Sequence, residues 1–223
     1  MSQNIWSLSG PMLQRQRRRG QFLSRLLKTR GSTFLLDIGC AEGYTTSYMG
    51  DAKDREVIGV ELDMTNLRIA KEKVKVASFV NASIVSLPFK PNVFDSVCIL
   101  EVLEHLQIED QLAGLSEAER VISSKGSLIL SAPFREQVIQ TVCIHCKMVT
   151  PLFGHLHTLD EEKMRKLVPN NFKLCKVDYL PNLQLVSCSN MFTRYPISLW
   201  LIVNRLLGVF KRGYWMILQY QKE

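Results

Sequence analysis

The feature that most constrains the fold is an apolar run that ends in a turn of small residues. Leu35 to Ile38 has the pattern of a buried strand, and Gly39-Cys40-Ala41-Glu42-Gly43 follows it before a segment suited to a helix. Such a strand, turn and helix form a place for a nucleotide. Glu61 follows a second apolar run, Val57–Val60, at the spacing from which a carboxylate accepts hydrogen bonds from ribose hydroxyls. The sequence therefore predicts a site for an adenosine-bearing cofactor.

The middle of the turn argues against a dinucleotide. A Gly-x-Gly-x-x-Gly turn lets backbone approach a pyrophosphate closely, whereas Ala41 places a methyl group there. The turn resembles instead the first motif of class I S-adenosylmethionine-dependent methyltransferases, whose ligand carries no phosphate. Ser86–Val97 resembles the Leu-Pro-Phe and Phe-Asp segment of this family, and Leu103-Glu104-His105-Leu106 resembles its Leu-Glu-His-Leu motif. The resemblance covers residues 34–178, which also hold the later family elements in order.

The fold that the resemblance implies is α/β: a Rossmann-like, seven-stranded, mostly parallel sheet with helices on both faces. The chain also alternates apolar strands with helices, which independently predicts a parallel sheet covered on both sides. We expect strands at Phe34–Ile38, Val57–Val60, Ser78–Ala82, Phe94–Leu100, Leu128–Ser131, Phe172–Tyr179 and Tyr214–Tyr220. Helices are expected at Met12–Lys28, from about Tyr44, at Asn66–Val74, Asp110–Ile122 and Leu159–Val168, the last with a capping box from Thr158 to Glu161.

One domain is expected over residues 1–223, since a chain of this length can bury a single core. Residues 1–33 would form a basic N-terminal helix, and residues 181–212 an apolar insertion between the last two strands, over the open edge of the sheet. Within the insertion, Pro196–Phe210 is apolar almost all round yet too short to span a bilayer. We favour a lid over the substrate pocket; the alternative is a membrane-interface helix whose Arg205, Lys211 and Arg212 reach anionic head groups.

The family resemblance assigns a cofactor site. Asp37 and the backbone of the following turn would hold the methionine moiety, Gly43 would let the next helix pack closely, and Glu61 would take the ribose. Where many relatives carry an Asp that accepts the adenine amino group, this chain has Ser83, an uncharged acceptor for which an ordinary strand-end role is an equal alternative. The expected cofactor residues are Asp37, Gly39, Cys40, Ala41, Gly43, Glu61, Leu62, Ser83, Ile84 and Leu100.

A second constellation has the residue types of a metal site. Cys143 and Cys146 form a Cys-x-x-Cys pair, and His155 and His157 form a His-x-His pair shortly after it. Together they predict a structural zinc of the Cys2His2 type. The segment also follows the fifth expected strand, where this family places substrate-contacting loops, so the two histidines are alternatively substrate contacts or proton acceptors. Ordinary loop residues are the third interpretation.

No catalytic residue is assigned, because methyl transfer from a sulfonium requires mainly positioning. The candidates are His105, His155 and His157. His105 is expected at the mouth of the cofactor pocket, where capping or orienting its loop suits it somewhat better than acting as a base.

Basic residues are concentrated at the two ends of a chain whose net charge is +7. The first 36 residues contain seven basic residues and no acidic one. Solvated helix faces, attraction to anionic lipid or a phosphorylated substrate, and nucleic-acid binding are the three interpretations. Nucleic-acid methylation is disfavoured because neither an Asn-Pro-Pro-Tyr-like nor a Pro-Cys motif occurs. Six scattered cysteines, no secretory signal and no membrane span predict a cytoplasmic protein, with peripheral membrane association as an option.

The function predicted from these patterns is S-adenosylmethionine-dependent methylation of a small or lipid-like acceptor, at an oxygen or a carbon atom. One alternative is a methyltransferase-like scaffold that binds the cofactor without turnover. The other is an RNA methyltransferase. The loops that select the acceptor carry no pattern from which it can be named.

Overall fold

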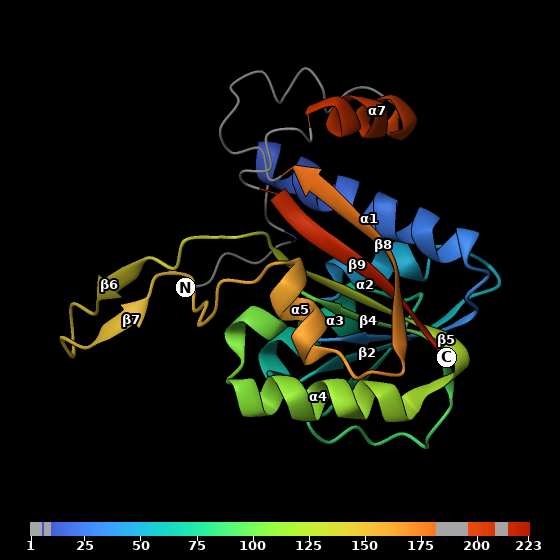
Figure 1. Cartoon of the computed structure of the whole chain (residues 1–223), viewed down its shortest axis with the longest axis horizontal. Helices are drawn as coiled ribbons and strands as arrows, with labels where there is room; N and C mark the ends of the chain where they lie inside the picture. Colours follow the sequence, from blue (N-terminus) through green and yellow to red (C-terminus); the bar gives the residue numbers. More distant parts are fainter. Residues whose placement is uncertain (1–5, 7–9, 182–195, 208–213) are drawn as a thin grey trace.

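The core of the molecule is one seven-stranded sheet in the order β3-β2-β1-β4-β5-β9-β8. A computed structural model describes residue 6 and residues 10–181, 196–207 and 214–223 (Figure 1). Neighbouring strands from β3 to β5 are parallel, and β9 is antiparallel to both β5 and β8. The predicted α/β fold is confirmed. The strands are β1 (Phe34–Ile38), β2 (Glu56–Glu61), β3 (Ser78–Asn81), β4 (Phe94–Leu100), β5 (Ile122–Pro133), β8 (Phe172–Pro181) and β9 (Tyr214–Lys222).

Two apolar cores lie on the two faces of the sheet because successive strand residues point to opposite sides. Leu36 and Ile38 of β1 belong to the core under α4 and α5, whereas Leu35 belongs to the core under α1 and α2. The helices are α1 (Gly10–Thr29), α2 (Tyr44–Met49), α3 (Met64–Lys73), α4 (Ile108–Val121), α5 (Glu161–Leu167) and α7 (Ile197–Leu207), with a 3-10 turn, η2, at Leu103–His105.

The start of α5 differs from its predicted capping box. Asp160 is the N-cap residue, and its carboxylate accepts a hydrogen bond from the Lys163 amide at 3.0 Å. Thr158 instead donates its hydroxyl to the Glu136 carbonyl oxygen at 2.8 Å. The helix therefore begins at Glu161, two residues later than predicted, because a tertiary contact takes the Thr158 hydroxyl and Asp160 caps the helix instead.

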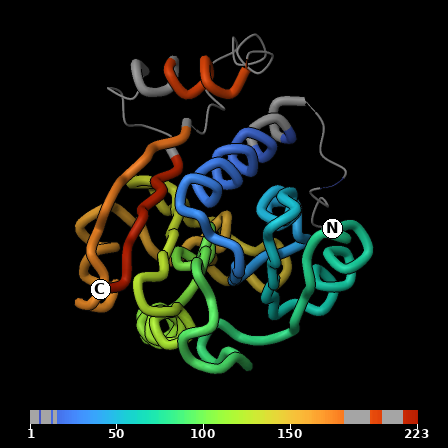
Figure 2. The backbone as a smooth tube through the Cα atoms, turned by 90° about the vertical axis from the view of Figure 1, so that its right-hand side faces the viewer, coloured from blue at the N-terminus to red at the C-terminus, as the bar shows by residue number. Residues whose placement is uncertain are grey.

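The segment between β8 and β9 contains α7, which lies against α1 (Figure 2). Trp200 is buried in the same core as Phe22 and Leu23 of α1, beside Leu180 and Trp215 at the adjoining ends of β8 and β9. The described helix thus packs on α1 rather than along the open edge of the sheet. Residues 208–213, with the Lys211 and Arg212 of the membrane alternative, lie outside the described residues. No helix in the described ranges is long and apolar enough to cross a bilayer.

A small hairpin stands apart from the main sheet. Its strands are β6 (Gln140–Val142) and β7 (Val149–Pro151), which pair only with each other among the described strands. It projects from the side of the body that carries α5 (Figure 1).

Candidate functional site

The turn after β1 contains three residues with positive φ angles, one of which is not glycine. Gly39 and Gly43 have positive φ angles, 74° and 76°, and so does Ala41, at 47°, which is uncommon for a residue with a Cβ. The amides of Gly39 and Cys40 donate to the Val60 carbonyl oxygen at 2.8 and 3.0 Å. The turn is therefore bound to the end of the neighbouring strand, β2.

Glu61 completes this arrangement from the end of β2. One of its carboxylate oxygens accepts the Ala41 amide at 2.9 Å, and the other accepts the Asp63 amide at 2.8 Å. The N–H groups of residues 39–41 are thus used within the protein. A ligand at this turn meets carbonyl and carboxylate oxygens, which suit hydrogen-bond donors such as an ammonium group or ribose hydroxyls.

Two cavities adjoin the turn and share Gly39, Ala41 and Glu101 in their linings. The first cavity, of about 350 Å³, is mostly apolar, and its lining includes the predicted cofactor residues Gly39, Ala41, Glu61, Leu62, Ser83 and Ile84. The second cavity, of about 330 Å³, is more polar, and its lining includes Asp37, Gly39, Cys40, Ala41 and Leu100. The carboxyl ends of β1, β2 and β4 thus place most of the predicted residues in the linings of two cavities that adjoin the same turn.

Gly43 lies in neither cavity lining. A Cβ at this position would come within 3.2 Å of side chains of Val74, Ala70 and Phe79. Its lack of a side chain therefore serves the close packing of the start of α2 on its neighbours.

Asp37 is the deepest polar group of the second cavity, with 2% of its surface exposed. Burial raises its pKa to about 6, although a hydrogen bond from Thr46 and the nearby Arg19 both favour the charged form. The Thr46 hydroxyl donates to the carboxylate at 2.6 Å and so joins the end of β1 to α2.

Two residues that the sequence analysis did not select, Glu101 and Arg19, contact each other at the second cavity. Glu101 directly follows β4, has a positive φ of 56° and lines both cavities. Its carboxylate lies 3.2 Å from the Arg19 guanidinium and accepts the Ser131 hydroxyl at 2.8 Å. Arg19 is buried and also lies over the Trp215 ring. The sequence gives a weak indication for Glu101, because a charged residue at the end of an apolar strand is a candidate site residue. Nothing in the sequence distinguishes Arg19 from the other basic residues around it.

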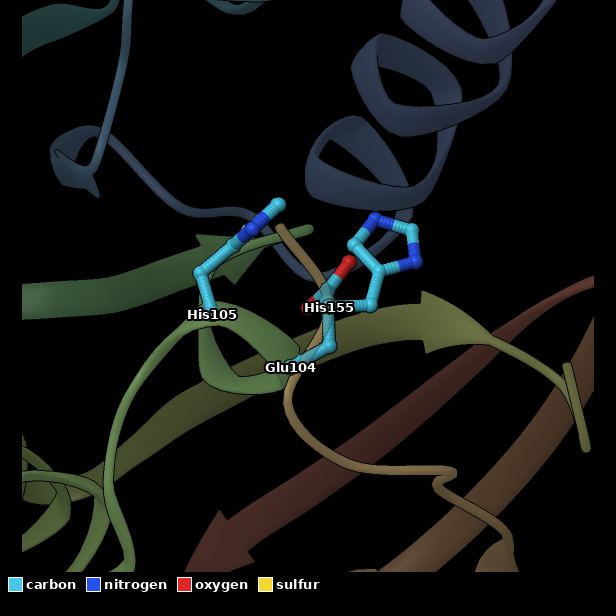
Figure 3. Close-up of side chains that lie close together, drawn as sticks. All are labelled: Glu104, His105 and His155. Carbon is cyan, nitrogen blue, oxygen red and sulfur yellow. The ribbon is translucent and has the colours of Figure 1, made fainter. Parts of the chain in front are cut away.

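Glu104, His105 and His155 form a cluster beside the first cavity (Figure 3). Each offers a ligand atom, and these atoms lie within 4.8 Å of one another. Glu104 is 1% exposed, and burial, followed by the charge of Glu101, raises the pKa of its carboxyl well above the ordinary value. Burial also lowers the pKa of His105, which lines the first cavity.

The predicted Cys2His2 zinc site is not assembled. Cys143 and Cys146 lie in the turn of the β6–β7 hairpin, whereas His155 belongs to the cluster with Glu104 and His105. His157 stands outside that cluster, with a buried Nε2 that has no hydrogen-bond partner among the described residues. Across the described part of the chain, the cluster is the single group of three or more metal-ligand side chains within that distance.

Comparisons with known proteins agree with this geometry. Residues 36–130 match the family model described as a methyltransferase domain. The 27-O-demethylrifamycin SV methyltransferase of Amycolatopsis mediterranei is 31% identical over 114 residues, 48% of this chain and 41% of the relative. The 18S rRNA (guanine-N(7))-methyltransferase bud23 of Schizosaccharomyces pombe is 27% identical over 94 residues, 41% and 35% of the two chains.

The solved structures agree on the fold over a larger part of the chain. The crystal structure of a SAM-dependent methyltransferase from Aquifex aeolicus matches with a TM-score of 0.62 at 15% identity, and the match covers 98% of this chain and 97% of that one. The curated relatives are matched over less than half of their own length. The solved structures therefore share the fold with this chain, and the curated relatives resemble it over part of their length.

Proposed function

Because this chain belongs to the class I S-adenosylmethionine-dependent methyltransferases, we propose that it transfers a methyl group from S-adenosylmethionine to an oxygen or carbon atom of a small or lipid-like acceptor. The observation that carries the proposal is the pair of cavities on either side of the Gly39–Ala41 turn. Their chemistry fits the two halves of the cofactor, an apolar cavity for adenine and an acceptor-rich cavity for the amino acid end.

Different residues would hold the two halves of the cofactor. In the first cavity, Leu62 and Ile84 offer apolar surface to adenine, and Glu61 offers carboxylate oxygens to the ribose hydroxyls. In the second, Asp37 and Glu101 are acceptors for an ammonium group. When bound, the cofactor supplies an electrophilic methyl group, and the protein's contribution is to hold the acceptor in line with it.

The acceptor class rests on support of different kinds. The name of the Amycolatopsis mediterranei relative gives a small-molecule acceptor, which supports the small or lipid-like class. A ribosomal RNA acceptor is the second candidate, favoured by the bud23 relative and by an open groove of about 600 Å³ lined by Arg17, Arg25, Tyr44 and Tyr48. Basic and aromatic side chains together are the usual surface for single-stranded nucleic acid.

Label transfer from radioactive S-adenosylmethionine separates these candidates. Purified protein is incubated with cell extract that has been fractionated into small molecules, lipids and RNA, and each fraction is counted. We expect label in the small-molecule or lipid fraction. Label in RNA alone would replace the proposal with the second candidate. Cofactor binding measured by calorimetry, with no label in any fraction, would favour the scaffold that binds without turnover.

A further inference from the structure

Three side chains beside the first cavity remain unexplained by cofactor binding: Glu104, His105 and His155 (Figure 3). The first two come from η2, which follows β4 after two intervening residues, and the third comes from the segment after β7. Leu156 holds this segment in place, since its amide donates to the Glu104 carbonyl oxygen at 2.7 Å. Backbone contacts thus bring the cluster together from positions fifty residues apart.

Glu104 is a buried acid whose carboxyl group is not satisfied. Its two carboxyl oxygens are fully buried, and neither has a hydrogen-bond partner among the described residues. A buried carboxyl group normally has a hydrogen-bond donor or a cation beside it, because leaving it without one is costly. The group therefore indicates a ligand at this place.

In both His105 and His155, one ring nitrogen is hydrogen-bonded to an oxygen acceptor. His105 Nδ1 lies 3.2 Å from the Gly154 carbonyl oxygen, and His155 Nδ1 is hydrogen-bonded to the Glu136 carboxylate. Carbonyl and carboxylate oxygens only accept, so each Nδ1 carries the proton and each neutral ring has an unprotonated Nε2. A hydrogen bond from Nδ1–H to an oxygen acceptor is the arrangement that orients histidines so that Nε2 faces a metal ion.

We propose that Glu104, His105 and His155 bind a divalent transition-metal ion through one carboxylate oxygen and two imidazole nitrogens. Their ligand atoms lie within 4.8 Å of one another. Tetrahedral ligands at about 2.1 Å from an ion are separated by about 3.4 Å, so small side-chain rotations close the site.

The ligand set selects the class of ion. Two imidazoles with one carboxylate suit Zn²⁺, Fe²⁺, Co²⁺ and Mn²⁺, whereas Mg²⁺ and Ca²⁺ prefer oxygen ligands throughout. The local charge also favours a cation, because the carboxylates of Glu101 and Glu136 lie near the cluster. The positive charge of Arg19 is paired with Glu101.

Three protein ligands leave at least one coordination position open. Since His105 lines the first cavity, an ion held here would stand next to the expected cofactor. The bound ion could then hold an oxygen of the methyl acceptor beside the methyl donor, a role that rests on the proposed function. Binding of the metal itself does not rest on it.

Cobalt titration tests the site without any turnover. Protein freed of metal with a chelator is titrated with Co²⁺ in the absence of S-adenosylmethionine, and the visible absorption bands of the bound ion are followed. We expect one Co²⁺ per chain, displaced by Zn²⁺ but not by Mg²⁺. His155→Gln should weaken binding at least tenfold, and Glu136→Gln, which removes only the orienting carboxylate, by about tenfold or more.

The double variant Cys143→Ser, Cys146→Ser is the matched control. It removes the other metal-ligand pair and should leave the cobalt spectrum and affinity unchanged. Loss of the spectrum in this variant, or no binding by the parent protein, would overturn the inference. Calorimetry with S-adenosylhomocysteine on metal-free protein is read separately, so that failure of the cofactor site and failure of the metal site are distinguishable.

Discussion

Replacement of Glu61 by glutamine tests the central part of the proposed cofactor site. The carboxylate accepts the Ala41 amide at 2.9 Å and the Asp63 amide at 2.8 Å, one on each oxygen. Glutamine has a single carbonyl oxygen, so it keeps one of these bonds and turns an amide N–H group toward the other donor. The substitution therefore perturbs the turn even before a ligand binds.

The magnitude of each effect follows from the type of hydrogen bond. A hydrogen bond to a charged group contributes about 1.5–3 kcal/mol, so the free energy of unfolding should fall by about that amount. If the same oxygens accept the ribose hydroxyls, binding of S-adenosylhomocysteine should weaken by a further 1–3 kcal/mol or so, which is roughly 5- to 150-fold in the dissociation constant.

Urea unfolding measures the first effect, and calorimetric titration with S-adenosylhomocysteine measures the second. Glu56→Gln is the control, since Glu56 is an exposed carboxylate at the other end of the same strand. It should leave both quantities nearly unchanged. Lower stability with unchanged affinity would refute the ribose role and leave Glu61 as a residue that only holds the turn. Unchanged stability would refute the hydrogen-bond reasoning itself.

Three further predictions concern other parts of the molecule. Burial raises the pKa of Asp37 to about 6 from 3.8, so the stabilisation from its proton is complete below pH 3.8 and is lost as the pH rises through about 6. Asp37→Asn does not titrate, so urea unfolding should show the parent losing about 2.4 kcal/mol relative to the variant between pH 4 and pH 7. A difference that stays constant over this range would contradict the prediction. Trp200→Ala should lower the free energy of unfolding by about 3 kcal/mol and leave affinity for S-adenosylhomocysteine within about twofold, because Trp200 packs against α1 and lines neither cavity. The Cys143 sulfur accepts hydrogen bonds from the backbone amides of Cys146 and His145, which lower the pKa of the Cys143 thiol. Iodoacetamide at neutral pH should therefore alkylate Cys143 faster than the exposed Cys175. Mass spectrometry of the alkylated peptides measures this difference.

The sheet was predictable because its strands are apolar runs between helices. Phe34–Ile38 and Phe94–Leu100 were predicted with the bounds that the structure has, since both strands are covered on two faces and are mostly apolar. The β6–β7 hairpin was not predicted, because its strands have three residues each and are mostly exposed. Such short strands carry no periodicity that distinguishes them from a loop.

The turn after β1 could be predicted from local sequence, and its surroundings could not. Gly39, Glu61 and their neighbours lie in motifs with a fixed spacing, so the sequence places them at one end of the sheet. Arg19 and Ser131, by contrast, meet across 112 positions of the chain, and no local pattern records that contact. The same limit explains the incorrect zinc assignment. His155 is near Cys146 in sequence, but the fold pairs it with His105, fifty residues earlier.

Part of the positive charge of α1 has a structural role, which bears on what the basic N-terminus does. Arg19 binds Glu101 and Ser131, and Arg30 donates to the Ser127 hydroxyl at 2.7 Å and to the Gln219 and Gln221 side chains. Arg19 in α1 and Arg30 directly after it therefore hold this helix against β5 and β9, where the direction of the sheet reverses. A solvated helix face therefore does not describe them. Since Arg19 also lines the second cavity, docking of α1 completes the wall of that cavity. The exposed Arg17 and Arg25 of this helix, both at the open groove, remain available to an anionic partner.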